Sequence, residues 1–437
     1  MPTDAPGRSP SRLTDRGCAV IVPRQAHQTA RWKRRCRTVR RRVLGILFAT
    51  LFIVMVGFAM LFPVEPYYVR TFGATSRTMG WLIASFSLAQ FVFSPMWGRL
   101  SDRMGRKPVL MMGLAGYAVS MALFGLARSI PALFVTRTLA GVLSSATLPT
   151  ALAIIADTTT EEDRTRGMGV VGAAFGLGVI FGPFVGGVLG EINIRLPFAA
   201  AAALSLVTLA LVGWMLPESL RRDGGETTQA ARGSRWAAIR GEAAILYLVG
   251  FLVTFSLAGL ETAFPFLAND RFGLTQRSVG YIYAVMGLVG AAVQGGLVGR
   301  MKRAVGEYGM ILGGLLTSGA GMAGLAVAPS PAIATAAISL FAAGHGFIRP
   351  ALTSLVSQRA RVGHGLAIGA LSSMDSLGRI LGPVAGGTLY VTRELLPFAA
   401  GSAINALAFL GLLVLPLARP VALLAGSRGG QTPTESK

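Results

Sequence analysis

Charged residues are scarce in this sequence. Only 14% of its 437 residues are Asp, Glu, Lys or Arg, and 52% are hydrophobic. Soluble proteins carry about 25% charged residues, and a soluble chain could not cover so much apolar surface with so few charges. The composition therefore argues against a soluble enzyme and against a disordered chain. It indicates several membrane-spanning helices.

Cysteine and histidine are also rare, with two and three residues. Both cysteines, Cys18 and Cys36, lie in a basic N-terminal segment, so no disulfide framework is expected. The sequence contains no HExxH motif, no phosphate-binding loop of ATPases, and no paired Cys or His spacing that would hold a metal. We therefore expect no enzyme activity, no catalytic residue, no metal, no other cofactor and no ATP-driven pumping.

Twelve apolar runs fill most of the chain, each near the length of about 20 residues that crosses a bilayer. They cover residues 43–69, 78–98, 108–127, 131–156, 167–190, 196–216, 243–268, 277–299, 308–328, 331–357, 366–391 and 395–417. This pattern predicts an all-α membrane protein of twelve transmembrane helices, divided into bundles at 43–216 and 243–417. A basic, disordered cytoplasmic tail is expected at 1–42, a cytoplasmic linker at 217–242, and a second cytoplasmic tail at 418–437.

Basic residues outnumber acidic ones by 41 to 19, but they are spread over the gaps between the apolar runs. Counted alternately, the gaps on the side of the two termini hold 31 Lys and Arg, and those on the other side hold seven. Because cytoplasmic loops are rich in Lys and Arg, we expect a multi-pass protein of the plasma membrane with both termini in the cytoplasm. Its partners would be the lipid bilayer, protons and a small-molecule substrate, with no nucleic acid, and the protein would be a monomer.

The two halves of the chain repeat each other. GPFVGG at 182–187 returns as GPVAGG at 382–387, and FGATSRTMGW from Phe72 returns as FGLTQRSVGY from Phe272. Repeats with an even number of helices keep one orientation in the membrane, so they are related by a pseudo-two-fold axis along the membrane normal. A substrate site is expected between the halves at mid-depth.

Three segments resemble a known family. The loop GRLSDRMGRK is similar to the signature between helices 2 and 3 of the major facilitator superfamily, through Gly98, Leu100, Asp102, Arg103, Gly105, Arg106 and Lys107. Leu133, Arg137 and Gly141 resemble the helix 4 motif of its proton-coupled members. The helix 5 motif of its drug:proton antiporters is matched by Gly178, Gly182, Pro183, Gly186 and Gly187, and LPES at 216–219 is similar to the tetracycline and multidrug efflux branch. The resemblance covers about 43–417 and implies a twelve-helix transporter.

The loop at 98–107 is the expected cytoplasmic gate, with Gly98, Asp102, Arg103, Gly105, Arg106 and Lys107 as its residues. A carboxylate among arginines can make charge-assisted hydrogen bonds that hold helices together. The resemblance implies that Asp102 and Arg106 bridge to the other half in the outward-open state, while the alternative is a tight glycine turn with positive-inside charges. In the second half Arg303 and Glu307 take these two places, so the charges are swapped and that gate is degenerate.

The GPxxGG segments place small residues on one helix face and a proline that removes a helix hydrogen bond. They predict either a close packing seam or a hinge in helix 5 and again in helix 11. The helix 11 residues are Gly378, Gly382, Pro383, Gly386 and Gly387.

Ionisable residues inside the apolar runs are candidates for proton coupling and for the substrate cavity, because a charge inside the bilayer is costly and faces protein or water. They are Glu65, Arg137, Glu261, His345, Arg349, Asp375 and Arg379. The resemblance implies that helices 1, 4, 7 and 10 line the cavity and ties the position of Arg137 to proton coupling. Asp375 and Arg379 form either an intrahelical ion pair or a switch in which a protonated Asp375 releases Arg379 or Arg349.

These features support a secondary transporter driven by the proton gradient. We expect proton-coupled efflux of small amphipathic or drug-like molecules by alternating access of the two halves. Two alternatives stay open from the sequence: a proton symporter or sugar or metabolite carrier on the same fold, and a membrane sensor that transports nothing.

Overall fold

The computed structural model describes residues 30–158, 161–219, 244–359 and 363–414, and the secondary structure in these ranges is helical. The N-terminal half contains α1 (Ala30–Ala59), α2 (Glu65–Arg70), α3 (Ser76–Met104), α4 (Arg106–Leu126), α5 (Ile130–Ser144), α6 (Thr147–Thr158), α7 (Glu161–Ile192) and α8 (Leu196–Met215). The C-terminal half contains α10 (Ala244–Phe272), α11 (Gln276–Ala292), the π-helical turn η1 (Val293–Leu297), α12 (Val298–Val327), α13 (Pro331–Arg359), α14 (His364–Thr392) and α15 (Leu396–Val414).

These helices make twelve crossings, as predicted. Nine helices in the described ranges are long and apolar enough to span a bilayer, and one of them, Gln276–Val327, has 52 residues and provides two crossings. It turns at Gly306, whose φ of 69° favours glycine. The shorter apolar stretch Leu44–Ala59 of α1 and the helix α14 complete the twelve.

Two crossings are interrupted, one between α1 and α2 and the other between α5 and α6. The break between α1 and α2 shapes the site. α1 ends at Ala59 and α2 begins at Glu65, with Pro63 in the intervening turn. Proline cannot donate a backbone hydrogen bond, which favours the break. α1 begins at Ala30, inside the segment predicted as a tail. Residues 1–29, 220–243 and 415–437, with most of the predicted linker and C-terminal tail, lie outside the described residues.

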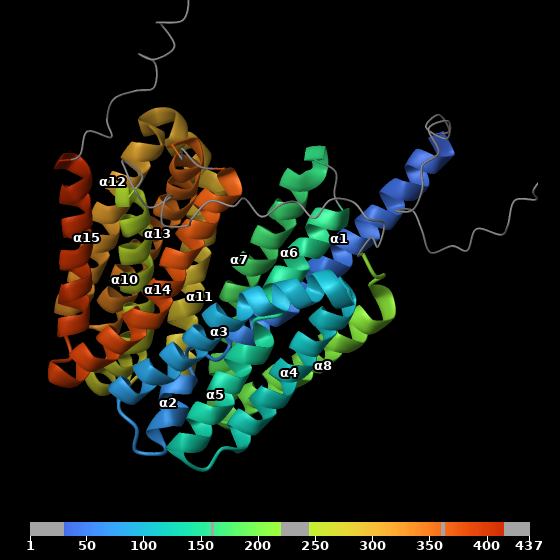
Figure 1. Ribbon diagram of the computed structural model, residues 1–437. Coiled ribbons are helices and arrows are strands. Elements are labelled where there is room, and N and C mark those ends of the chain that lie inside the picture. The colour runs from blue at the N-terminus through green and yellow to red at the C-terminus, as the bar shows by residue number, and fades with distance from the viewer. Residues whose placement is uncertain (1–29, 159–160, 220–243, 360–362, 415–437) are drawn as a thin grey trace, which may run out of the picture.

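The two six-helix bundles converge at the end of the molecule that carries α2 (Figure 1). We call this end the α2 face, and the opposite end, with the loop at 98–107, the basic face. One hydrophobic core near the α2 face contains side chains of both halves, such as Tyr68 and Phe266, whereas two further cores each belong to a single half. The halves are therefore joined by packing at the α2 face.

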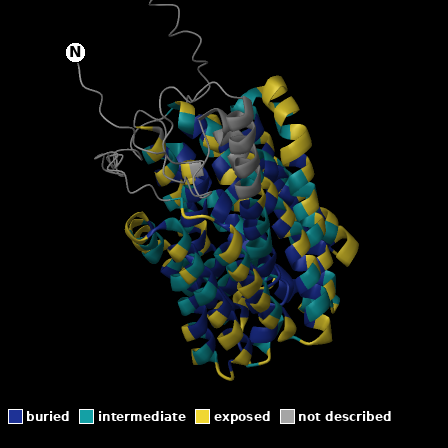
Figure 2. Ribbon diagram, turned by 90° about the vertical axis from the view of Figure 1, so that its right-hand side faces the viewer, coloured by how far each residue is buried: buried dark blue, intermediate teal, exposed yellow. Residues whose placement is uncertain are grey.

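Many exposed residues lie on the outer helices of the molecule, and buried residues are concentrated toward its interior (Figure 2). Many of the exposed side chains are large and apolar; Trp214, for example, is 90% exposed. A soluble protein rarely presents such a continuous apolar surface. It suits a protein surrounded by lipid chains.

Candidate functional site

A cavity of about 260 Å³ lies between the two halves, next to the junction at the α2 face. The N-terminal half contributes lining residues from α1 to α7, and the C-terminal half contributes them from α10 and α14. Its wall is largely apolar with a few polar groups, as in sites that bind small organic molecules. The aromatic and ionisable lining residues are Phe58, Phe62, Phe86, Tyr117, Phe175, Glu65, Arg137, Glu261 and Arg379.

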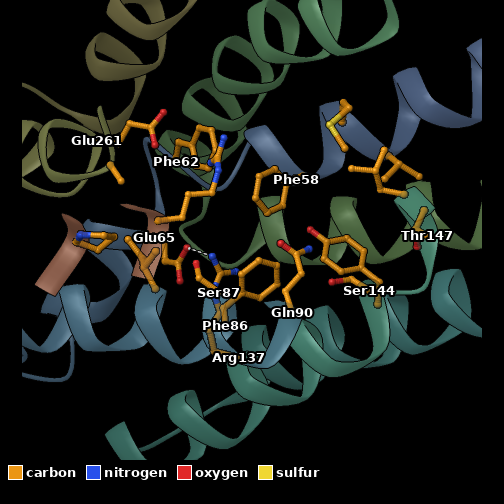
Figure 3. Close-up of a pocket in the computed structure, with 18 of the residues that line it drawn as sticks. Phe58, Phe62, Glu65, Phe86, Ser87, Gln90, Arg137, Ser144, Thr147 and Glu261 are labelled. Carbon is orange, nitrogen blue, oxygen red and sulfur yellow. Dashed lines mark ion pairs between the residues drawn. The ribbon is translucent and has the colours of Figure 1, made fainter. Parts of the chain in front are cut away.

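A buried ion pair forms part of this wall. Arg137 Nη2 of α5 lies 2.9 Å from Glu65 Oε2 of α2, and their side chains are 3% and 1% exposed (Figure 3). The guanidinium also lies over the Phe86 ring, 4.8 Å from its centroid. Glu65 Oε1 and Arg137 Nε and Nη1 have no hydrogen-bond partner among the described residues. The pair is therefore short of hydrogen bonds, and it lies where a charge or proton that enters the cavity would meet it.

The C-terminal half contributes Glu261 of α10 and Arg379 of α14 to the same cavity. Within the described ranges neither side chain forms an ion pair. Glu261 and Phe62 lie toward one end of the cavity and Ser144 and Thr147 toward the other (Figure 3). The cavity thus presents an acid and a cation from one half opposite an aromatic wall from the other.

Asp375 forms its ion pair across two helices. Its Oδ1 lies 2.7 Å from Arg349 Nη1 of α13 and accepts a hydrogen bond of 2.9 Å from Thr254 Oγ1 of α10. Of the two partners left open by the sequence, the structure therefore pairs Asp375 with Arg349 rather than with Arg379 on its own helix. The Arg349 side chain is 47% exposed and that of Asp375 10%, so the pair is open on the side of Arg349.

His345 of α13 lies apart from the cavity wall. Its ring stacks on Phe341 with a centroid distance of 5.9 Å, and its Nδ1 has no partner in the part of the chain that the structure describes. The resemblance implied that the first, fourth, seventh and tenth membrane crossings line the cavity. The first (α1 and α2), the fourth (α5 and α6) and the seventh (α10) do so, together with α3, α4, α7 and α14. The tenth crossing, α13, contributes none of the lining residues.

The loop at 98–107 makes its contacts within its own half. Arg106 binds Asp102 and lies 3.2 Å from Asp157 at the end of α6. Glu218 accepts hydrogen bonds from the backbone N–H groups of Arg106, at 2.9 Å, and Lys107, at 3.2 Å. Carboxylates at a helix N-terminus are favoured by the helix dipole, so these contacts fix the start of α4.

The corresponding loop of the other half has the reversed charges that the sequence indicated. Glu307 lies 2.9 Å from Lys302 Nζ and accepts hydrogen bonds from Ser354 and Gln358 of α13, each 3.1 Å long. Both loops therefore join two helices of their own half. The bridge from Asp102 and Arg106 to the other half stays a prediction for a different state of the protein.

Each GPxxGG segment packs against a helix of its own half and against a helix of the other half. Three glycines of each segment lie against a helix of the same half: Gly178, Gly182 and Gly186 against α1, and Gly378, Gly382 and Gly386 against α10. The last glycine of each lies against the other half, Gly187 on α11 and Gly387 on α3. A Cβ at any of these positions would clash with its neighbour. The segments thus form close packing seams, including the seam between the halves at the α2 face.

One charged contact that joins the halves in the structure was not predicted from the sequence. Arg70 at the end of α2 forms an ion pair of 2.7 Å with Asp270 near the end of α10. The two residues are 200 positions apart, the offset of the internal repeat, and carry opposite charges. That signal was present in the sequence, but a charge near a helix end is commonly an interfacial residue.

The chain matches the family model described as Major Facilitator Superfamily over residues 47–364. The chain belongs to the major facilitator superfamily. It is therefore a multi-pass membrane transporter and not an enzyme.

Relatives within the major facilitator superfamily are similar over most of their length. Multidrug resistance protein 2 of Bacillus subtilis (strain 168) is 30% identical over 366 residues, which are 82% of this chain and 91% of the relative. Tetracycline resistance protein, class E, of Escherichia coli is 32% identical over 365 residues, 81% of this chain and 89% of the relative. The crystal structure of the human organic anion transporter MFSD10 (TETRAN) is 25% identical, with a TM-score of 0.65 over 85% of this chain and 99% of that chain.

Proposed function

We propose that this chain exports small amphipathic molecules in exchange for protons. The observation that carries the proposal is the buried pair Glu65–Arg137 in the wall of a mainly apolar cavity between two halves. The names of the relatives, multidrug resistance and tetracycline resistance proteins, support export of drug-like molecules. The aromatic wall offers apolar surface to such a molecule, and Glu261 and Arg379 offer it one charge of each sign.

Protonation of Glu65 would couple the proton to movement. A neutral Glu65 no longer compensates Arg137, and an uncompensated charge in a buried site is costly. This electrostatic cost falls when α2 and α5 separate or when Arg137 binds another hydrogen-bond acceptor. Substrate and proton would then compete through the same cavity, which is the requirement for exchange.

The basic face would be the cytoplasmic one, because it carries the loops that are rich in Lys and Arg. In that orientation the packing of the halves at the α2 face would close the protein to the outside. Alternating access then requires the contacts of the α2 face to open while the two basic-face loops approach each other. Export would begin from this state, with substrate entering the cavity from the basic face.

A flux assay tests this function. Purified protein in proteoliposomes is given tetracycline or a fluorescent lipophilic cation, and a pH gradient is imposed across the vesicle membrane. We expect accumulation opposite to the proton flow, abolished by a protonophore and reduced at least tenfold in Glu65→Gln. Glu394→Gln is the control, because Glu394 is an exposed carboxylate that is not among the residues lining the cavity.

Flux in the same direction as the protons would show a symporter and contradict export. Absence of any gradient-dependent flux over a wide substrate panel would contradict transport coupled to protons. Asp375→Asn, measured beside Glu65→Gln, shows whether the Arg349–Asp375 pair takes part in coupling or only joins α13 to α14.

A further inference from the structure

The short helix α2 has one side fixed to its own half. Glu65, its first residue, pairs with Arg137 of α5. Tyr68, three residues later on the same side, is buried, and its hydroxyl group donates to the Phe124 carbonyl oxygen at the end of α4, at 3.1 Å. Residues three apart lie on one face of a helix. This face therefore belongs to the N-terminal bundle.

The opposite side of α2 is bound to the other half. The Tyr67 hydroxyl group donates to the Leu274 carbonyl oxygen at 2.8 Å, and Arg70, again three residues later, binds Asp270. Each half of the transporter thus holds one face of the same six-residue helix.

The Arg70–Asp270 contact has the geometry of a strong ion pair. Arg70 Nη1 and Nη2 donate to Asp270 Oδ1 and Oδ2, each at 2.7 Å, and such two-pronged pairs are the stronger kind. Arg70 Nη1 also donates to Asn269 Oδ1 at 2.6 Å, and the Tyr390 hydroxyl group of α14 donates to Asp270 at 2.8 Å. The guanidinium lies 4.6 Å from the Phe266 ring centroid. We call Arg70 and Asp270 the α2 clamp.

The two ends of α2 are close together. Arg70 follows Glu65 by five positions, a rise of about 7.5 Å in a helix. The charged and titratable groups that face Glu65 are Arg137 of α5 and the Tyr117 hydroxyl of α4. Because one stiff turn and a half of helix joins the two sites, a displacement of Glu65 moves Arg70 with it.

We propose that Arg70 and Asp270 are positioning residues of the transport cycle. The α2 clamp holds the α2 face closed, and α2 couples it to the Glu65–Arg137 pair, so that loss of the charge on Glu65 loosens the clamp. The coupling rests on the proposed function, in which Glu65 receives the proton. The clamp itself depends only on the contacts between the halves.

The separation of the two halves at the α2 face can be measured as the distance between two spin labels in the full-length protein in lipid nanodiscs. The labels are placed at Leu126 and Val327, the ends of α4 and α12 on the α2 face, which are 68% and 74% exposed. Cys18 and Cys36 are first replaced by Ser. The variants are Asp270→Asn, Arg70→Asp, the charge exchange Arg70→Asp with Asp270→Arg, and Glu65→Gln.

We expect each single change to raise the ratio of long-distance to short-distance populations about fivefold, the effect of a partly exposed ion pair. The charge exchange should return the distribution toward that of the parent, and Glu65→Gln should shift it in the same direction as Asp270→Asn. Arg271→Asp is the control: the charge change is the same and the position is adjacent, but the Arg271 guanidinium lies over Phe272 of its own helix.

A charge-exchanged protein as open as the single variants would overturn the clamp, and a parent-like distribution in Glu65→Gln would overturn its coupling through α2. The distances require no transport. If the shifts appear in a protein without proton-driven flux, the proposed function fails and the clamp stands. If flux is proton-driven but the distances do not move, the clamp fails and the function stands.

Discussion

Removal of one partner from the Glu65–Arg137 pair should destabilise the protein far more than removal of both. The two side chains are 1% and 3% exposed and 2.9 Å apart. A single buried charge left without its partner costs about 3–5 kcal/mol, whereas replacement of the whole pair by uncharged groups is often close to neutral. Arg137 would keep its contact with the Phe86 ring at 4.8 Å, but a cation–π contact contributes only about 2 kcal/mol in a desolvated site.

The experiment is a double-mutant cycle on the free energy of unfolding of the full-length protein in detergent. Glu65→Gln should lower this free energy by about 3 kcal/mol, and the addition of Arg137→Met should recover most of the loss. The transition can be followed by helical circular dichroism during titration with a denaturing detergent. The control is Glu191→Gln, which breaks an ion pair with side chains 52% and 40% exposed and should cost less than about 1 kcal/mol.

Additive losses would refute this reasoning. If the double variant is as unstable as the sum of the two single variants, the charges do not compensate each other, and water or another group must already satisfy them. Proton uptake by Glu65 would then impose no electrostatic cost on Arg137, and the coupling step proposed above would have no driving force.

Three further predictions concern other parts of the fold. Gly387→Leu should hold the halves apart at the α2 face, because even a Cβ there meets the Ser76 backbone, and tetracycline flux in proteoliposomes should fall more than tenfold. Gly105→Ala should lower the free energy of unfolding by about 1–3 kcal/mol, measured by the same denaturation, because Gly105 has a φ of 111° and its Cβ would meet Glu218. Asp375→Asn should lower that free energy by less than Glu65→Gln does, because the Arg349 side chain is 47% exposed although that of Asp375 is only 10% exposed, while proton-driven flux falls. A loss of stability as large as that of Glu65→Gln would make Asp375 a structural residue.

The fold could be predicted because each of its determinants is local in the sequence. Lengths of apolar runs set the crossings, and the return of GPxxGG after 200 residues sets the two halves. The helix ends agree within about six residues, with two exceptions: α1 starts at Ala30, and the helix expected to end at 299 continues to the turn at Gly306. Nothing in a hydropathy pattern shows where a helix that leaves the bilayer will end.

The contacts of the site depend on helix rotation, which the sequence does not reveal. Asp375 and Arg379 are four residues apart and could meet, yet α14 presents Asp375 to Arg349 and Thr254 while Arg379 faces the cavity. Intramembrane charge was a sufficient signal to find these residues. It was insufficient to assign partners, because the partners come from three different helices, α10, α13 and α14.

The internal repeat explains why the α2 clamp must be asymmetric. Residues related by a two-fold axis can touch each other only near that axis, and Arg70 and Asp270 are repeat-related residues that do touch. Two like charges would repel at this place, so the two halves have to differ here. Away from the axis the same halves can stay alike: Gly80 lies on the Pro383 carbonyl oxygen, and its repeat-related residue Gly280 lies on that of Pro183. The seam between the halves therefore combines equivalent glycine contacts with two charge pairs, Arg70–Asp270 and the more exposed Glu191–Arg277. Among these contacts, the charge pairs can be weakened by a change in charge without altering the packing surfaces that must close again.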